Sequence, residues 1–426
     1  MAIGVPKKQK RDASKKVGAA VALCYPGKRT PEEILEALPG DFELVRKVGS
    51  ESPRNRLYFG ENLGVLSNLN RDPTVRGHVR LVYIDPPYAT QTVFHSRALA
   101  HAYEDMFDGS EYLEFMRERL LFLHSLLASD GSIYVHLDAK MVFQVKIIMD
   151  EVFGASCFRN CITRRKSNPK NYTRKQFGNV SDYILFYAKT DKYIWNRQVE
   201  PWTEARAKEY QYVDPATGRR FMKVPIHAPG IRYGATGEAW RGMAPPPGKH
   251  WQFLPSTLDE MDARGEIYWS KNGNPRRKVF LDKSVGVPVQ DIWLDCIDAH
   301  NQNVDITGYP TEKPLNLLKR IVAASSNVGD LVLDCFSGSG TTLVAADMLG
   351  RRWIGVDSSP EAIKTTLHRF ELGMKPMGDF GGKGKLESDV QPKLFGDSGV
   401  RPATSQHTVT DFAYICESGL LKTLAR

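Results

Sequence analysis

The sequence predicts an α/β protein with a mostly parallel central sheet and a second domain inserted into it. In two separate stretches, short apolar runs typical of strands buried on both faces alternate with amphipathic helical segments. A polar turn directly follows three of these runs, and the stretch between the two α/β parts lacks the pattern. The length of 426 residues accommodates two or three domains. With 42% apolar and 25% charged residues, the composition excludes a collagen, a coiled coil and a wholly disordered chain.

The first α/β half is predicted over residues 30–155. Residues 81–84 form a short apolar strand, and residues 111–128 carry apolar side chains at helical spacing. Residues 133–137 read as the next strand, followed by another amphipathic helix. At the end of that strand, His136 and Asp138 either line a cleft or are structural.

The second α/β half is predicted over residues 304–372. A helix is expected around Leu317–Val322, followed by a strand that ends at Asp334 and another that ends at Asp357. Ligands of open α/β sheets bind beyond the carboxyl ends of the strands. The two halves are therefore expected to complete one sheet and to share one site at its edge.

The two ends of the chain differ from these halves in composition. Residues 1–29 are rich in Lys and Arg without periodicity, so we expect a flexible basic tail that is either solvated or in contact with nucleic acid. Residues 373–426 begin with many glycines and are expected to be a linker and a C-terminal tail.

Residues 156–303 are predicted to form the inserted domain. They are rich in Pro, Gly, Trp and basic residues, and they carry a net charge as large as that of the whole chain, which is +9. Cations beside aromatic rings suit a nucleic-acid surface, although the rings could instead form the core of the domain. The candidate nucleic-acid contacts are Arg164, Arg165, Lys166, Arg276, Arg277 and Lys278.

A glycine-rich turn, Asp334-Cys335-Phe336-Ser337-Gly338-Ser339-Gly340-Thr341-Thr342, follows the first strand of the second half. Its glycines allow a tight turn and the close approach of a ligand to the backbone. No Gly-Lys-Ser/Thr follows, so it is not a P-loop, and Leu343 stands where a dinucleotide-binding turn has its third glycine. On its own, the turn fits a structural role as well as a binding role.

Asp357 closes the next strand, and an acid at such a position can accept both hydroxyls of a ribose. Together with the glycine turn it indicates a nucleoside-containing cofactor without a pyrophosphate, which favours S-adenosylmethionine over NAD. The alternative role for Asp357 is to cap the helix that begins near Pro360, and the two roles are compatible.

Asp85-Pro86-Pro87-Tyr88 directly follows the apolar strand of the first half. The two prolines hold the Asp85 side chain and the Pro86 carbonyl in set positions. If these two groups accept the hydrogens of an aromatic amine, its nitrogen lone pair becomes available for attack. Tyr88 can stack on the base, as in pockets for flipped bases. The alternative is a simple turn with a solvent-facing acid.

These motifs resemble those of the amino-group DNA methyltransferases, which form N6-methyladenine or N4-methylcytosine. The Asp-Pro-Pro-Tyr motif precedes the Phe-x-Gly-x-Gly motif, which is the circularly permuted order of the β group that includes type III modification subunits. Residues 60–63 (Gly-Glu-Asn-Leu) resemble a segment upstream of the catalytic strand. Residues 309–315 resemble the His-Pro-Thr-Gln-Lys-Pro segment of this family, with Tyr309 and Glu312 as departures.

The resemblance implies a Rossmann-like methyltransferase fold, S-adenosylmethionine as cofactor and a target-recognition role for residues 156–303. It implies that the catalytic residues are Asp85, Pro86, Pro87 and Tyr88, and that the cofactor-binding residues are Asp334, Phe336, Gly338, Gly340, Asp357, Thr311 and Lys313. In this family an Asp in the first motif position tends to accompany adenine, so we expect N6-adenine methylation of double-stranded DNA.

Other functions remain as alternatives: N4-cytosine methylation, methylation of an RNA base, a catalytically silent DNA-binding protein or, more distantly, a hydride-transfer enzyme. No Cys/His cluster predicts a metal, and no run of uncharged residues is long enough for a membrane helix, so we expect a cytoplasmic protein. Residues 391–395 (Gln-Pro-Lys-Leu-Phe) resemble peptides that dock on bacterial sliding clamps, or are part of a plain linker. The sequence leaves open whether a restriction subunit or a second copy of the chain binds.

Overall fold

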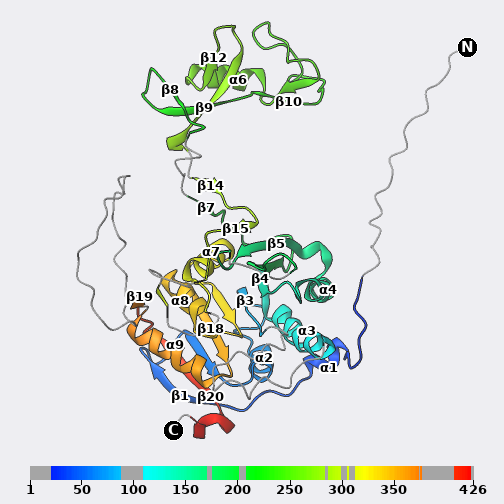
Figure 1. The fold of residues 1–426 in the computed structure, drawn as a ribbon, viewed down its shortest axis with the longest axis vertical. Helices are drawn as coiled ribbons and strands as arrows, with labels where there is room; N and C mark the ends of the chain where they lie inside the picture. Colours follow the sequence, from blue (N-terminus) through cyan, green and yellow to red (C-terminus); the bar gives the residue numbers. More distant parts are fainter. Residues whose placement is uncertain are drawn as a thin grey trace, which may run out of the picture. The chain divides into compact units, whose positions relative to one another are not determined.

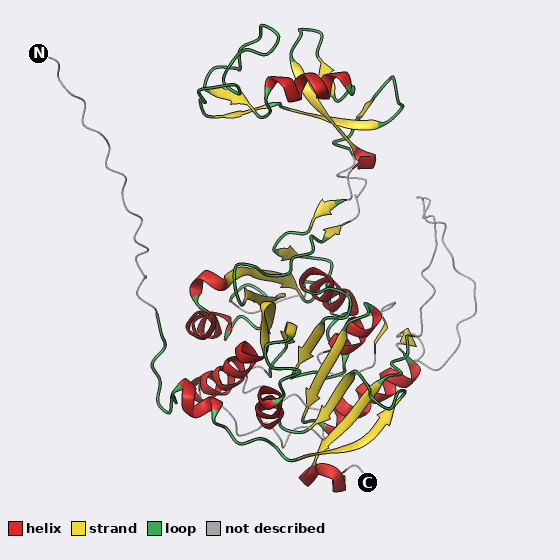
Figure 2. Ribbon diagram, turned by 180° about the vertical axis from the view of Figure 1, so that it is seen from behind, coloured by secondary structure: helices red, strands yellow, loops and turns green. Residues whose placement is uncertain are grey.

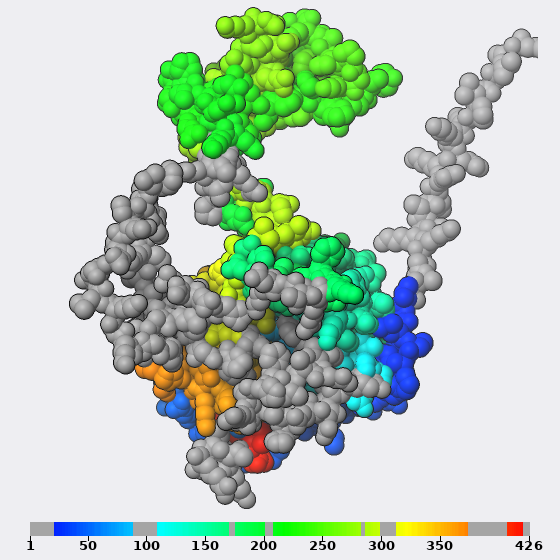
Figure 3. All heavy atoms as spheres, in the orientation of Figure 1, coloured from blue at the N-terminus to red at the C-terminus, as the bar shows by residue number. Residues whose placement is uncertain are grey.

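The computed structural model describes residues 21–87, 109–169, 175–200, 208–283, 286–298, 305–306, 312–373, 375–376 and 407–423 (Figure 1). The chain divides into two compact units, one made of residues 1–196 with 290–426 and the other of residues 197–289. Figure 3 draws the second unit in green, with all heavy atoms as spheres.

The first unit is built on a ten-stranded sheet. From one edge to the other, the strands are β1 (Phe42–Val48), β20 (Phe412–Glu417), β2 (Asn55–Phe59), β18 (Arg352–Asp357), β17 (Leu331–Asp334), β3 (Val79–Ile84), β4 (Leu127–Leu137), β6 (Ser181–Ala188), β5 (Phe158–Arg165) and β15 (Ile292–Trp293). All pairs from β20 to β4 are parallel, and β15 is parallel to β5. The pairs of β1 with β20 and of β6 with both β4 and β5 are antiparallel. The prediction of a largely parallel sheet shared by both halves is confirmed.

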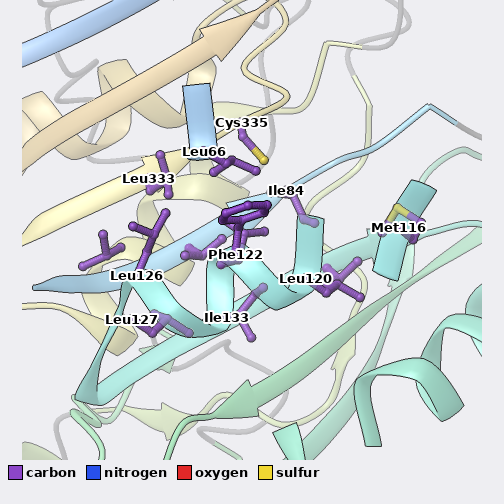
Figure 4. Packing of buried hydrophobic residues seen from close by; sticks show 14 of the residues in the cluster. Leu66, Ile84, Met116, Leu120, Phe122, Leu126, Leu127, Ile133, Leu333 and Cys335 are labelled. Atoms are coloured by element: carbon purple, nitrogen blue, oxygen red, sulfur yellow. The ribbon is translucent and has the colours of Figure 1, made fainter. Parts of the chain in front are cut away.

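Helices pack on both faces of this sheet (Figure 2). One group consists of α1 (Pro31–Leu35), α2 (Asn62–Arg71), α3 (Gly109–Leu126) and α4 (Val142–Phe153), and the other of α7 (Leu315–Ser325), α8 (Thr341–Met348) and α9 (Pro360–Leu372). In the first group, Phe122 and Leu120 of α3 lie in one buried cluster with Leu66, Ile133 and Leu333 (Figure 4). Side chains alternate along a strand, so both faces of β18 are buried, with Ile354 in this cluster and Trp353 against Phe370 of α9.

Part of the predicted flexible tail packs on the first unit. Residues 21–29 are described, and their side chains reach the first helix group: Tyr25 donates a hydrogen bond to Glu114 at 2.7 Å, and Lys28 pairs with Glu151 at 2.8 Å. The helix start at Thr30 is confirmed by a capping box between Thr30 and Glu33.

The C-terminal segment is also more than a tail, because residues 412–417 form β20 inside the sheet, between β1 and β2. Phe412 is 2% exposed and its ring lies 5.2 Å from that of Phe370 and 6.1 Å from that of Trp353. His407 contacts Asp347 of α8 at 2.7 Å. The glycine-rich composition ahead of this strand concealed it, and β1, which pairs with it, was missed as well.

The inserted unit is smaller than the predicted 156–303, because β5, β6 and β15 belong to the main sheet. Its strands are β7 (Val199–Glu200), β8 (Tyr212–Val213), β9 (Arg220–Val224), β10 (His227–Pro229), β11 (Lys249–Trp251), β12 (Ile267–Trp269), β13 (Pro275–Phe280) and β14 (Val287–Pro288), with helix α6 (Pro255–Ala263). Trp240 and Trp251 are buried in a core with Leu258, Met261 and Ile267 of α6 and β12. Most of the tryptophans of this unit therefore form its core.

The remaining short elements are the 3-10 turns η1 (Ala155–Cys157), η2 (Leu281–Lys283) and η4 (Ser418–Thr423), and the paired strands β16 (Asp305–Ile306) and β19 (Lys375–Pro376). Within the described ranges, no helix is both long enough and apolar enough to cross a membrane.

We expect Phe412→Ala to lower the free energy of unfolding of the first unit by about 3 kcal/mol, because it removes a buried ring from between two others. Thermal and urea denaturation measure the change. Leu44→Ala is the control, since Leu44 lies on the neighbouring β1 but is 54% exposed, and it should change stability by less than about 0.5 kcal/mol. Equal effects of the two substitutions would show that β20 is not part of the core.

Candidate active site

The three motifs that follow strands in the sequence meet in one pocket. Asp85 follows β3, Phe336 follows β17 and Asp357 ends β18, and all three line a cavity of about 650 Å³. These strands are parallel neighbours, so their carboxyl ends lie at the same edge of the sheet. Within the described part of the chain, Asp334, Gly338, Lys313 and Pro87 of the predicted site also line this cavity.

The glycine turn needs its glycines for conformation and for space. Gly338 and Gly340 have φ values of 51° and 74°, which favour glycine. A Cβ on Gly340 would lie 2.8 Å from the Thr366 side chain, and the Thr366 hydroxyl donates to the Gly338 carbonyl at 2.9 Å. The turn is thereby held against α9.

Leu343, which stands in place of a third glycine, is accommodated by a glycine on the neighbouring strand. A Cβ on Gly355 of β18 would overlap with the Leu343 side chain. Close packing of α8 on the sheet is thus achieved by a small residue in the strand instead of one in the helix.

Asp357 supports the same turn. Its carboxylate accepts hydrogen bonds from the Gly338 N–H at 2.8 Å and the Ser359 N–H at 2.9 Å. Burial raises the pKa of Asp357, and these backbone donors oppose the rise. The cap of α9 is Ser359, whose side chain accepts from the Ala362 N–H. Asp357 therefore orients the glycine turn and faces the pocket, and it is not itself the helix cap.

Asp334 is fully buried beneath the turn. Burial raises the pKa of its carboxyl to about 7, despite hydrogen bonds from Thr342 and from the Phe336 N–H. Asp85 and Asp357 contribute to the rise because their negative charges disfavour a third carboxylate nearby. A cation bound in the pocket would favour the ionised form of Asp334.

Lys313 pairs with Asp85 across the pocket. The Lys313 ammonium contacts the Asp85 carboxylate, and Lys313 is only 8% exposed. Lys313 lies two residues before the start of α7, whereas Asp85 follows β3. The pair therefore joins the two α/β halves at the position of the predicted catalytic acid.

Glu312, one of the two departures from the family motif, forms a second buried ion pair. Its carboxylate contacts the guanidinium of Arg369, a residue of α9 that is 1% exposed. Arg369 also donates to the Ser339 carbonyl and the Thr341 hydroxyl, each at 2.7 Å. Glu312 and Lys313 thus tie the glycine turn to Asp85. Sequence reasoning missed Arg369, although an acid in place of glutamine was a signal for a cationic partner.

Glu61 and Asn62 of the segment Gly60-Glu61-Asn62-Leu63 also line the pocket. Glu61 caps α2, accepting from the Leu63 N–H at 2.6 Å, and it accepts from Arg119 at 2.6 Å. Asn62 accepts from Arg119 at 2.7 Å and donates to the Cys335 carbonyl at 2.9 Å.

Arg119 and Phe115 of α3 also line the pocket and were not predicted. The guanidinium carbon of Arg119 lies 3.5 Å from the centroid of the Phe115 ring, which is 6.0 Å from the Phe336 ring. An arginine and an aromatic residue one helical turn apart on a largely buried helix were the available signal.

A buried polar row leads away from the pocket. The Tyr83 hydroxyl lies 2.8 Å from His136 Nδ1, and His136 Nε2 lies 3.4 Å from Asp182. Burial lowers the pKa of His136. Although burial opposes it, hydrogen bonds with His136 and Lys166 lower the pKa of Asp182.

The acid at the end of this row, Asp182, also pairs with residues that were predicted to contact nucleic acid. Arg164 is fully buried and pairs with Asp298 and Asp182, so the prediction that it contacts DNA is wrong for this structure. Lys166 pairs with Asp182 at 2.8 Å, and Arg165 is half-buried.

Asp138, the other candidate at the end of the strand that carries His136, has a structural role. Its carboxylate accepts hydrogen bonds from the Lys140 and Met141 N–H groups and stabilises the turn before α4.

Tyr88, Thr311 and the segment 391–395 lie outside the described residues. The described cysteines are all free, and the described ranges contain no group of three or more His, Cys, Asp or Glu side chains arranged to hold a metal ion.

Comparisons with known proteins identify the family of the chain. A family model described as DNA methylase, of the N6/N4 methyltransferases, matches residues 79–368. The chain is 50% identical over 371 residues to the type II methyltransferase M.EcaI of Enterobacter cloacae. The aligned region covers 85% of this chain and 80% of that protein. The chain is 28% identical to the Mod subunit of the type III restriction-modification enzyme StyLTI of Salmonella typhimurium, over 75% of this chain and 53% of that subunit.

Among solved structures, a putative DNA modification methylase from Thermus thermophilus, complexed with S-adenosylmethionine, covers 74% of this chain and 92% of its own, with 18% identity and a TM-score of 0.38. The type II relative is more similar to this chain than the type III subunit is. The chain belongs to the N6/N4 DNA methylase family, whose members are methyltransferases that use S-adenosylmethionine.

Proposed function

We propose that this protein transfers a methyl group from S-adenosylmethionine to N6 of an adenine rotated out of double-stranded DNA, as the modification enzyme of a restriction-modification system. The observation that carries this proposal is the pocket in which Asp85, Phe336 and Asp357 meet. In the family that the motifs resemble, an Asp in the first position of the Asp-Pro-Pro-Tyr motif tends to accompany adenine as the target base, which favours adenine over cytosine here.

The pocket fits the cofactor in size and in chemistry. Its volume of about 650 Å³ suits a nucleoside-sized ligand. We assign Asp357 to the ribose, since each of its oxygens bonded to a backbone N–H keeps a lone pair for a further donor. The rest of the cofactor would be surrounded by the other predicted cofactor-binding residues: Asp334, Phe336, Gly338, Gly340, Thr311 and Lys313. S-adenosylmethionine supplies a methyl group on a positively charged sulfur, which makes the methyl electrophilic.

The target amine would bind at Asp85 and Pro86. The lone pair of an aromatic amine is delocalised into the ring, so the nitrogen attacks poorly. When the Asp85 carboxylate and the Pro86 carbonyl accept its two hydrogens, the nitrogen is drawn toward tetrahedral geometry. Lys313 keeps the Asp85 carboxylate in place. Tyr88 would stack on the base. Catalysis is then chiefly a matter of positioning.

The inserted unit, residues 197–289, is proposed to recognise the target sequence. A restriction subunit, a second copy of the chain and a sliding clamp that binds residues 391–395 stay as predicted partners.

We expect Asp85→Ala to reduce methyl transfer to DNA by at least about 100-fold, because the amine loses an acceptor that orients it. Binding of S-adenosylmethionine should persist. Transfer is measured with labelled cofactor, and mass spectrometry of the nucleosides from DNA and RNA substrates identifies the product. Detection of N4-methylcytosine would make cytosine the target in place of adenine, and a methylated base in the RNA substrate would make RNA the substrate in place of DNA. Full activity of the variant would refute the role of Asp85.

Glu312→Gln should weaken binding of S-adenosylmethionine about tenfold or more, because Arg369 keeps a buried charge without its partner and no longer holds the glycine turn. Replacing both residues, as Glu312→Gln with Arg369→Met, should recover part of the loss. Calorimetry gives the affinity and thermal melting the stability.

The control is Asp295→Gln, which removes an acid from the half-exposed pair of Asp295 with Arg320 and should have little effect. Wild-type affinity in Glu312→Gln would show that this pair does not position the cofactor site.

Because burial raises the pKa of Asp334 to about 7, this carboxyl is mostly protonated at pH ~6 and mostly ionised at pH ~8. The cationic cofactor prefers the ionised form, so its affinity should rise up to about tenfold between these pH values. Titration calorimetry measures it. In Asp334→Asn, this rise of the cofactor affinity with pH should vanish. If the affinity of the variant instead depends on pH as in the wild type, ionisation of Asp334 does not control cofactor binding.

A further inference from the structure

The four-stranded sheet of the inserted unit has two chemically different faces. Its strands run in the order β12–β13–β9–β8, all antiparallel. Arg276 is paired with Tyr268 and Lys278 with Lys223 in this register. Residues paired across strands share a face and successive residues alternate, so Arg277 lies on the opposite face from Arg276 and Lys278.

One face is part of the core. Ile267 and Trp269 of β12 pack with Leu258 and Met261 of α6. Arg277 lies on this side, with its guanidinium 5.7 Å from the centroid of the Phe253 ring. This face is thus covered by α6 and its neighbours.

The other face carries rings and cations. The Lys223 ammonium lies between Tyr212 and Tyr268, 3.5 Å from the centroid of each ring. Phe221 lies between the same two tyrosines, at 5.7 Å and 6.3 Å. Tyr212 is 37% exposed, so the edge of this ring cluster reaches solvent. The rings hold the charge of Lys223 in a fixed place at the surface.

Several cations on or beside this face have no acidic partner. Among the described residues, no carboxylate lies within ion-pair distance of Arg276, Lys223 or Lys249. Lys249 belongs to β11, which pairs with β10, and β10 follows β9 after two residues. Burial lowers the pKa of His227 in β10, and the charges of Lys249 and Arg276 add to this effect, in agreement with their lying near its ring.

Four other cations of the unit are paired with acids. Lys278 pairs with Asp214 at 3.4 Å, and Arg219 with Asp282 at 2.7 Å. On the α6 side, Arg241 pairs with Asp259 and Asp262, and Arg264 with Glu260 and Glu266. The paired cations Arg241 and Arg264 thus lie on the α6 side, whereas Arg276, Lys223 and Lys249 have no described carboxylate within ion-pair distance.

We propose that this face of β8–β9–β13–β12 is the surface through which the inserted unit binds the DNA backbone, with Arg276, Lys249 and Lys223 as its phosphate-contacting charges. Unpaired cations close together repel one another, and a polyanion relieves this repulsion. Tyr212, which is partly exposed beside them, can donate a hydrogen bond to a phosphate oxygen. Arg277 and Lys278, which the sequence grouped with Arg276, have packing and pairing roles instead. The inference rests on DNA being the substrate.

The test compares two charge-matched double variants of the full chain. Arg276→Gln with Lys249→Gln removes two unpaired cations, and Arg241→Gln with Arg264→Gln removes two paired cations from the α6 side. Fluorescence anisotropy with a labelled DNA duplex measures affinity over a range of salt concentrations, without cofactor.

We expect the first variant to bind at least tenfold more weakly and to lower the slope of log affinity against log salt by about two, one for each lost phosphate contact. The second should keep the wild-type slope. Circular dichroism spectra and thermal melting curves like those of the wild type confirm that the inserted unit is folded in both variants.

Equal losses in the two variants, or none in the first, would overturn the proposal, as would stronger binding of RNA than of the duplex. The assay involves no methyl transfer, so its result is separate from that of the proposed reaction. A chain that binds duplex DNA through this face but forms no N6-methyladenine would refute the proposed N6-adenine methylation and would leave this inference intact.

Discussion

The parallel pairing of β18, β17 and β3 is the constraint on which the site depends. These strands are buried on both faces and so carry apolar side chains along their length. Polar groups can be placed only where the strands end, and parallel neighbours end at the same edge. Asp85, the glycine turn after Asp334 and Asp357 are distant in the sequence, yet they line one cavity for this reason.

Two buried ion pairs fix the edge of the sheet. Lys313 contacts Asp85 and Glu312 contacts Arg369, so consecutive residues connect the acid of one half to the glycine turn of the other. Breaking one such buried pair typically costs about 3–5 kcal/mol, because a charge is left without its partner. Asp334 lies in the same region, and burial raises the pKa of its carboxyl toward neutrality. Pairing and burial thus set the charges of this pocket residue by residue.

Positive charge alone does not identify the surface that meets DNA. Arg164, Arg165 and Lys166 form one basic cluster in the sequence, but Arg164 is buried, and both Arg164 and Lys166 pair with Asp182. Arg276 belongs to a similar cluster, and no described carboxylate pairs with it. Arg276 differs from Arg164 and Lys166 because no described acid lies within ion-pair distance of it, although its neighbour Lys278 pairs with Asp214.

The sequence by itself determined the local features of this protein. The strand before Asp85, the glycine turn, the helix start at Thr30 and the order of the motifs follow from periodicity and turn chemistry, which act over a few residues. Only the tertiary structure decided that residues 412–417 complete the sheet, that the inserted unit spans 197–289, and that Arg119 and Arg369 support the pocket. Strand order and ion pairing depend on partners far along the chain, and no local pattern specifies which distant residue will be the neighbour.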